Sequence, residues 1–335
     1  MLPTMKKTED LLRYLESYPD PIIRWKMTRY VLGNTSSPSV FPGARKELAL
    51  SPTVQRLMSD RNVDGQIPYH PYDKWFGAHW VLSILADLGY PERDDSLKPL
   101  MEQCYGTWLS KAHERYIRMI NGRIRRCASQ EGNCVYYSLA LGLADDRTEE
   151  LASRLIKWQW EDGGWNCDKR PEAAKSSFNE TLIPLRGLTW YAKSSGDPKA
   201  KQAANSAAEV FLKRHLFKRI TDERIIYKNF VQLHYPNYWH YDILFSLKVM
   251  SEAGFINDPR CADALDLLES KQLSDGGFPA EERYYRVDAK KLSGHSRVDW
   301  GGTSKVHMNP FVSVDAIAVL KQAGRFVVYR ELQTG

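Results

Sequence analysis

The chain lacks the features of a membrane-spanning, secreted or nucleic-acid-binding protein. No uninterrupted apolar run reaches the about 18 residues that a transmembrane helix needs. Residues 1–10 contain no apolar core of the signal-peptide kind. The net charge of +6 is too small and too dispersed for a continuous basic footprint, so no nucleic-acid partner is expected. We predict a cytoplasmic protein, with peripheral membrane contact and oligomeric state left open.

Cysteine is scarce, and its pattern excludes a disulfide scaffold. The five cysteines are odd in number and have no paired spacing, which is typical of free thiols in a reducing compartment. The 43% hydrophobic and 26% charged residues are those of a folded globular chain. Ten tryptophans indicate large rings that are buried or line a cavity.

Alternating strand patterns are also few, whereas one helical unit recurs at least four times. An amphipathic helix leads into a glycine turn and then into a second, more apolar helix. The clearest copy spans 151–191 and turns at Asp162-Gly163-Gly164-Trp165. A second copy spans 264–278 and resumes at 309–324 after an insertion, and two weaker copies turn at Gly65 and Gly122.

These repeats predict a single all-α domain over residues 1–335. A lone hairpin cannot bury its apolar face and must stack on its neighbours, and six such hairpins can close into a ring. We therefore expect an (α/α)6 toroid with the apolar second helices inside and the charged first helices outside. An N-terminal helix over 6–32 would precede the repeats at about 53–324, and a tail would occupy 325–335.

The turn residues carry a resemblance to a known superfamily. The segment Gln159-x-x-x-Gly163-x-Trp165 is similar to the QW motif of squalene and oxidosqualene cyclases, and its copy at 272–278 has phenylalanine in place of tryptophan. The resemblance covers roughly residues 53–324. It implies the α/α toroid of the terpenoid cyclases and protein prenyltransferases, in which these residues have a structural role.

The reaction motifs of that superfamily are missing. The Asp-x-Asp-Asp acid of squalene cyclases and the zinc-binding Asp-x-Cys of protein prenyltransferases do not occur. Glu92-Arg93-Asp94-Asp95 is expected in a loop, and the acidic run that starts at Asp145 is expected to cap a helix. By resemblance to prenyltransferases, the basic residues after Trp165, at 169, 170 and 175, would bind a diphosphate.

Polar residues at the starts of the inner helices would converge on one mouth of such a ring. Three acids and two histidines are candidates for general acid or base chemistry, and the alternative for each is a structural cap, ion pair or core hydrogen bond. The catalytic candidates are His240, Asp242, Glu180, Asp315 and His79.

The same mouth supplies candidates for substrate and metal binding. Arginine binds phosphates bidentately, and aromatic faces stabilise cations. The substrate-binding candidates are Arg126, Asp168, Arg170, Lys74, Trp165, Tyr238 and Trp239. The metal candidates are Cys167, His240 and His307, for which no short ligand spacing exists, so zinc or magnesium stays open as a cofactor.

The sequence favours an enzyme that acts on an isoprenoid substrate, such as a prenyl diphosphate, in a central aromatic cavity. The partner would then be a small hydrophobic molecule. Two alternatives remain open: a non-catalytic toroid that binds a lipid or peptide, and an α/α-barrel hydrolase or lyase of carbohydrates.

Overall fold

The computed structural model describes residues 3–33, 43–288, 290 and 292–327, and these are mainly helical. The helices are α1 (Pro3–Glu16), α2 (Pro21–Tyr30), α3 (Ala44–Ala49), α4 (Pro52–Leu57), α5 (Ala78–Asp87), α6 (Lys98–Trp108), α7 (Lys111–Glu114), α8 (Ser129–Ala140), α9 (Asp146–Trp158), α10 (Phe178–Ser195), α11 (Pro198–Leu212), α12 (Ile243–Ala253), α13 (Ala262–Glu269) and α14 (Pro310–Gln322). Two antiparallel strands, β1 (Arg118–Ile120) and β2 (Arg123–Arg125), and two parallel strands, β3 (Arg286–Val287) and β4 (His295–Ser296), form small separate sheets.

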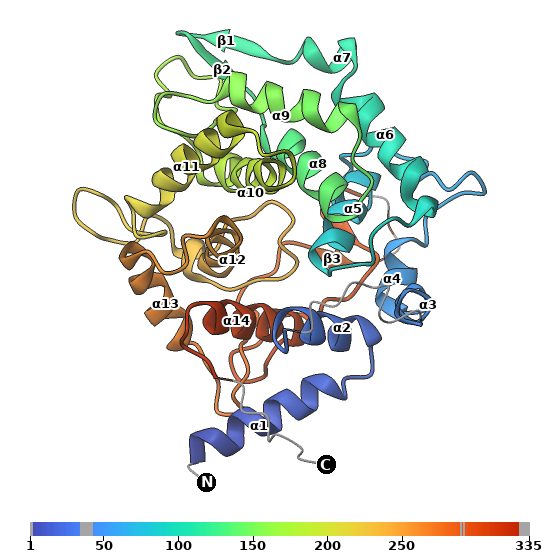
Figure 1. Ribbon diagram of the computed structural model, residues 1–335, viewed down its shortest axis with the longest axis vertical. Coiled ribbons are helices and arrows are strands. Elements are labelled where there is room, and N and C mark those ends of the chain that lie inside the picture. The colour runs from blue at the N-terminus through green and yellow to red at the C-terminus, as the bar shows by residue number, and fades with distance from the viewer. Residues whose placement is uncertain (1–2, 34–42, 289, 291, 328–335) are drawn as a thin grey trace.

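Helices α2, α5, α8, α10, α12 and α14 lie around the middle of the molecule (Figure 1). Each of these helices contacts the next in the order α2, α14, α12, α10, α8 and α5. The two ends of this series also meet. The indole of Trp25 on α2 donates to the carbonyl of Gly89 just after α5, at 2.7 Å, and Lys26 lies 3.5 Å from Asp87 on α5.

The remaining long helices lie outside these six. Helix α1 packs on α2, α6 on α5, α9 on α8 and α10, α11 on α10, and α13 on α12. All ten residues of α5 are buried, whereas α9 buries only one face, with Leu151, Leu155 and Trp158 among its buried side chains. The predicted difference between apolar inner and charged outer helices is therefore confirmed for this pair.

The glycine turns join the hairpins as their chemistry predicts. Gln159 donates through Nε2 to the carbonyls of Gly163 and Ala203, at 2.7 and 2.8 Å, and so links the turn to α11. Gly163 adopts φ +101°, and a Cβ there would lie 2.2 Å from the carbonyl oxygen of Ser206, so only glycine fits. The ring of Trp165 is buried and donates to the carbonyl of Leu155.

The prediction of one N-terminal helix over 6–32 is wrong. The chain forms two helices there, because the Pro19-Asp20-Pro21 segment interrupts the hydrogen bonding and the Asp20 carboxylate caps α2 by accepting from the Ile22 amide. The weak copy at Gly122 turns between the strands β1 and β2. Of the predicted tail, residues 328–335 lie outside the described residues.

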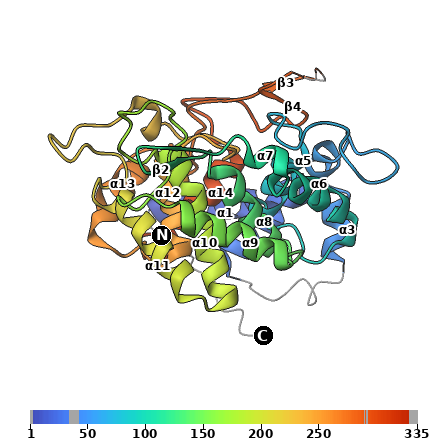
Figure 2. The same ribbon diagram turned by 90° about the horizontal axis from the view of Figure 1, so that it is seen from above.

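The expected cap at Asp145 is confirmed. Its carboxylate accepts from the Arg147 amide at the start of α9, with Thr148 completing a capping box. On one side of the molecule, facing upward in Figure 2, lie β3, β4 and the loops beside β2 and α7. Among the described helices, none combines the length and the apolar character required to cross a bilayer.

Candidate functional site

Two cysteines and one glutamate form a compact cluster near the starts of two inner helices. Cys127 lies two residues before α8, Cys167 lies in the loop that leads to α10, and Glu180 is the third residue of α10. Their sulfur and carboxylate atoms all lie within 4.8 Å of one another. Both cysteines are partly exposed, whereas Glu180 is buried.

Backbone contacts place the two cysteines side by side. The Arg126 amide donates to the carbonyl of Asn166 at 3.2 Å, and Arg125 and Asn166 form an isolated parallel bridge. Cys127 directly follows Arg126, and Cys167 directly follows Asn166, so this hydrogen bond brings the two cysteines together. The Ser177 amide donates to the carbonyl of Trp165, which ties the start of α10 to the same turn.

Glu180 is held by two donors from other segments. Its Oε2 accepts from the Ser129 amide at 3.0 Å, and its Oε1 accepts from the indole of Trp239 at 2.9 Å. Burial raises the pKa of this carboxyl above its ordinary value. Arg186, six residues further along α10, lies on a different face of the helix and pairs with Asp87 and Glu252 instead.

The two thiols differ in their environment. The side-chain hydrogen bond with Cys167, together with burial, raises the pKa of Cys127. The same hydrogen bond lowers the pKa of Cys167. The Sγ of Cys167 also lies 4.0 Å from Oε1 of Glu180, so the two thiols and the carboxylate are close neighbours.

Aromatic side chains surround a lysine next to this cluster. The ammonium of Lys74 lies 5.2 Å from the Trp75 ring centroid, 5.1 Å from that of Trp239 and 5.8 Å from that of Tyr72. Within the described part of the chain, no carboxylate lies in salt-bridge range of Lys74. Trp239 therefore donates to Glu180 of the cluster through its indole nitrogen, and its ring lies close to the ammonium of Lys74.

His240 and Asp242 lie on the same side of the molecule but have separate roles. His240 stacks on Tyr284, with ring centroids 3.6 Å apart, and burial lowers its pKa to about 3. Asp242 caps α12 by accepting from the Phe245 amide, and its other oxygen accepts from the His234 amide and lies 2.7 Å from Nδ1 of the His234 ring. The structural cap that was one interpretation of Asp242 accounts for the bond from the Phe245 amide, and the contacts with His234 are additional to it.

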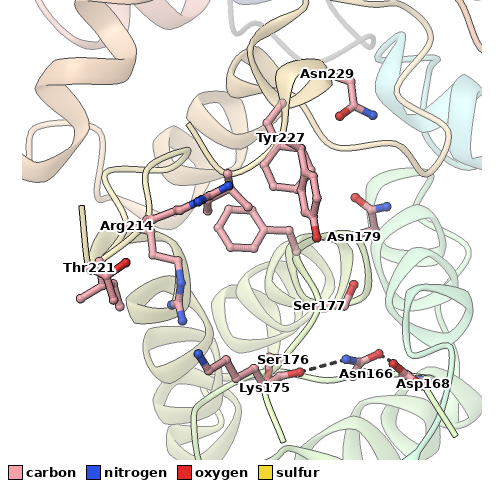
Figure 3. A pocket seen from close by; sticks show the side chains of 15 residues that line it. Asn166, Asp168, Lys175, Ser176, Ser177, Asn179, Arg214, Thr221, Tyr227 and Asn229 are labelled. Atoms are coloured by element: carbon pink, nitrogen blue, oxygen red, sulfur yellow. Dashed lines mark hydrogen bonds between the residues drawn. The ribbon is translucent and has the colours of Figure 1, made fainter. Parts of the chain in front are cut away.

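A cavity of about 760 Å³ opens beside the cluster (Figure 3). Asn166 and Asp168, which flank Cys167, and Asn179, which precedes Glu180, all line it. The wall also carries three basic side chains and several apolar ones: Lys175, Arg214, Arg219, Phe178, Ile220, Ile226, Tyr227 and Phe230. Figure 3 shows Lys175 and Arg214 on one side of the cavity and Asn179 and Asn229 on the other.

Of the residues predicted to bind substrate, Asp168 lines this cavity, as does Lys175, which was expected to bind a diphosphate. The carboxylate of Asp168 pairs with Arg170 in the same loop. Arg126 is 6% exposed and bonds to Glu131 and Gln130, so its charge is neutralised inside the protein. Tyr238 stacks on Trp75 with centroids 4.5 Å apart.

The basic wall of the cavity was only partly visible in the sequence. Lys175 follows a glycine turn and was named through the family resemblance. Arg214 and Arg219 lie beyond α11, in a segment without turn glycines, and no local signal distinguished them from surface residues.

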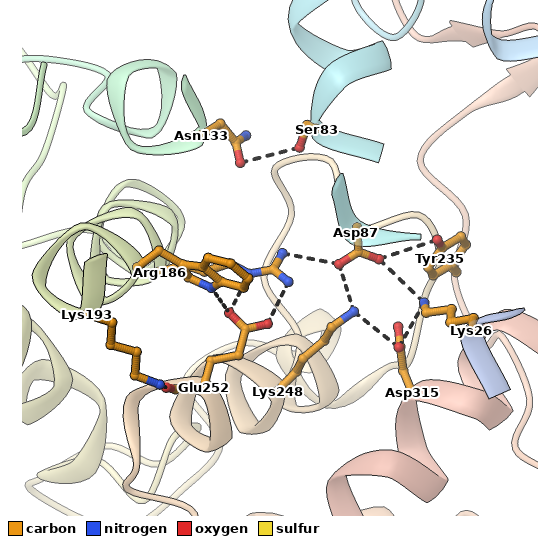
Figure 4. Close-up of polar contacts among 11 residues, drawn as sticks. Lys26, Ser83, Asp87, Asn133, Arg186, Lys193, Tyr235, Lys248, Glu252 and Asp315 are labelled. Atoms are coloured by element: carbon orange, nitrogen blue, oxygen red, sulfur yellow. Dashed lines mark hydrogen bonds and ion pairs between the residues drawn. The ribbon is translucent and has the colours of Figure 1, made fainter. Parts of the chain in front are cut away.

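A second polar cluster lies between the inner helices (Figure 4). Asp87 of α5 accepts from Lys248 of α12 at 2.7 Å and from Arg186 of α10 at 3.1 Å. Asp315 of α14 lies 2.8 Å from Lys26 of α2 and 3.1 Å from Lys248. Arg186 also pairs with Glu252 of α12 at 2.6 Å, so three cations meet three carboxylates.

Two of the acid or base candidates are thus placed in the interior. Asp315 belongs to the buried ion cluster, which matches the structural reading of that residue. His79 is fully buried, with Nδ1 3.3 Å from the Tyr137 hydroxyl, and burial lowers its pKa to about 3.

The donor set for a metal differs from the one expected. Among the described residues, Cys127, Cys167 and Glu180 are the one group of three histidine, cysteine or acidic side chains close enough to share an ion. His307 is exposed, and neither it nor His240 belongs to this group. Cys167 is the member that the sequence had already suggested.

Comparison of the chain with protein-family models, with curated proteins and with solved structures finds no match in any of the three.

Proposed function

We propose that the chain forms an (α/α)6 toroid and is an enzyme that acts on an isoprenoid diphosphate. The series of contacts among α2, α14, α12, α10, α8 and α5, with the α2–α5 contacts at Trp25 and Lys26, supports the ring. The reaction would be transfer, cyclisation or hydrolysis of the isoprenoid.

One observation carries this proposal: the cavity beside the start of α10 combines a basic wall with an apolar one. Lys175, Arg214 and Arg219 supply cations for a diphosphate, and Phe178, Phe230 and their apolar neighbours supply a surface for a hydrocarbon chain. A volume of about 760 Å³ suits a ligand of small-molecule size.

The neighbouring aromatic group adds to this argument. Tyr72, Trp75 and Trp239 lie around the positive charge of Lys74, and this arrangement of ring faces supports a site that stabilises a cation. A carbocation formed when a carbon–diphosphate bond breaks would be stabilised in the same way.

The test is direct binding and turnover with prenyl diphosphates of several chain lengths and with squalene, followed by mass spectrometry. Arg214→Gln should weaken retention of the prenyl diphosphate about 10- to 100-fold, because it removes a charge-assisted hydrogen bond worth ~1.5–3 kcal/mol. Lys213→Gln is the matched control, since Lys213 is exposed and does not line the cavity.

Two results would contradict the proposal. The first is wild-type protein that neither retains nor consumes any of these compounds. The second is equal retention by the Arg214→Gln and wild-type proteins.

A further inference from the structure

The geometry points to a zinc-type metal site formed by the thiolates of Cys127 and Cys167 and the carboxylate of Glu180. This inference goes beyond the isoprenoid proposal and does not depend on it, because metal binding is measured without any organic substrate.

The distances fit a tetrahedral ion of this class. With Zn–S bonds of about 2.3 Å and a Zn–O bond of about 2.1 Å, two sulfurs around one ion lie about 3.8 Å apart, and sulfur and oxygen about 3.6 Å. The three donor atoms here lie within 4.8 Å of one another, and Cys167 Sγ is 4.0 Å from Glu180 Oε1. Side-chain adjustments of less than about 1 Å bring them to bonding geometry.

The donor types select the metal. Two thiolates favour zinc and other borderline-soft divalent ions over magnesium or calcium, which prefer oxygen ligands throughout. The carboxylate is the third ligand. Three protein ligands leave one position of a tetrahedron open, as in catalytic rather than structural zinc sites.

The surroundings orient the ligands in the way that metal sites require. The indole of Trp239 donates to Oε1 of Glu180 and the amide of Ser129 donates to Oε2, and these two hydrogen bonds fix the orientation of the carboxylate. The pairing of Arg126 with Asn166 fixes the two cysteine-bearing segments relative to each other. Ligands that converge from three segments of the chain in this way are preorganised.

Access to the open position comes from the cavity of about 760 Å³. Asn166 and Asp168, on either side of Cys167, and Asn179, directly before Glu180, line it, and both cysteines are partly exposed. A water molecule, or a sulfur or oxygen atom of a substrate, can therefore reach the ion from this side. In the isoprenoid proposal, this position would activate the atom that accepts or replaces the diphosphate.

The experiment is metal titration of the full-length protein. The reduced protein is freed of metal with a chelator and titrated with Co²⁺, which reports thiolate ligation by charge-transfer absorption, and then with Zn²⁺ as competitor. We expect one ion per chain, with thiolate-to-cobalt bands that Zn²⁺ abolishes. Cys127→Ser combined with Cys167→Ser should remove the bands, and Cys261→Ser, at a buried cysteine outside the group, should leave them unchanged.

Two further variants separate the ligand from its support. Glu180→Gln should keep the charge-transfer bands, which come from sulfur, while the affinity for Co²⁺ falls. Trp239→Phe keeps all three ligands and removes one hydrogen bond to Glu180, so the affinity should fall by about 10- to 100-fold.

A measurement on the wild-type protein keeps the test valid if a variant fails to fold. Zn²⁺ should protect Cys127 and Cys167 from alkylation, as read by peptide mass spectrometry, and leave the reactivity of the other cysteines unchanged. The inference is overturned if no stoichiometric ion binds, if the double cysteine variant binds as well as the wild type, or if Zn²⁺ protects neither thiol. Metal binding without any isoprenoid binding would contradict only the proposed function.

Discussion

Replacing Lys248 with methionine should destabilise the protein strongly, because the buried ion cluster is balanced in charge. Lys26, Lys248 and Arg186 face Asp87, Asp315 and Glu252. Four of these six side chains are at most 5% exposed, Lys248 is 11% exposed and Glu252 is 20% exposed. Although burial favours the uncharged forms, the surrounding carboxylates hold the pKa of Lys248 above its ordinary value, and Lys248 and Lys26 hold the pKa of Asp87 well below it. Lys248 and Asp87 are therefore charged in the folded protein at neutral pH, whereas burial lowers the pKa of Lys26 below its ordinary value.

The magnitude follows from what the substitution leaves behind. Lys248→Met removes the contacts of 2.7 Å to Asp87 and 3.1 Å to Asp315 and leaves one buried negative charge in excess. Loss of one partner of a buried pair costs ~3–5 kcal/mol, whereas the shape of the lysine stem is largely kept by methionine. Adding Asp315→Asn to this variant restores the balance, so the double variant should be more stable than the sum of the two single losses predicts, by ~2 kcal/mol or more.

Urea denaturation followed by circular dichroism measures these differences. The control is Lys199→Met, because Lys199 is exposed on α11 and does not belong to the cluster, so its loss should change the free energy of unfolding by less than ~1 kcal/mol. The reasoning is refuted if Lys248→Met costs no more than the control, or if its effect and that of Asp315→Asn simply add. If Lys248→Met alone does not fold, recovery of a cooperative transition in the double variant tests the same coupling.

Two other predictions concern the interior and the turns. Burial lowers the pKa of His79 to about 3. At a pH below the ordinary histidine pKa of about 6.5, the unfolded chain therefore binds a proton at this residue that the folded chain does not. The free energy of unfolding should fall as the pH drops from 6.5 towards 3. Between pH 7 and pH 5 the loss is ~2 kcal/mol, and urea midpoints of the wild type should fall more over this interval than those of His79→Gln; equal falls would show that His79 is not the group responsible. Gly163→Ala should cost ~3–5 kcal/mol, since its Cβ would clash with the carbonyl of Ser206, whereas Gly196→Ala, also at positive φ but in open space, should cost ~1–2 kcal/mol. Thermal unfolding of the two variants compares them, and equal melting temperatures would contradict the steric argument.

The sequence predicted best those features that depend on neighbouring residues. The Asp145 cap and the turns at Gly163 and Gly276 were identified correctly, because capping and positive φ are decided within a few residues. The division into apolar and charged helices also follows directly from a 3.6-residue period. The break between α1 and α2 was missed although Pro19 and Pro21 are a local signal.

The candidate site was predicted only in outline. The expectation that polar residues gather near the inner-helix starts led to Cys167, Glu180, Trp239 and Lys74, which do lie in one region. It also led to Arg126, which pairs with Glu131 in the interior. Both kinds of residue look alike in the sequence, since a buried and an exposed arginine differ only in what surrounds them.

By itself, therefore, the sequence determined the helical class, the repeated hairpin and the turns, each of which is governed by contacts a few residues long. Only the tertiary structure decided which charges meet. Cys127 and Cys167 are 40 positions apart and become neighbours through the Arg126–Asn166 pairing, and Lys26 and Asp315 meet across nearly the whole chain. Burial makes these contacts decisive for ionisation, because a charge or thiol that is removed from water can be stabilised only by the groups that the packing places beside it.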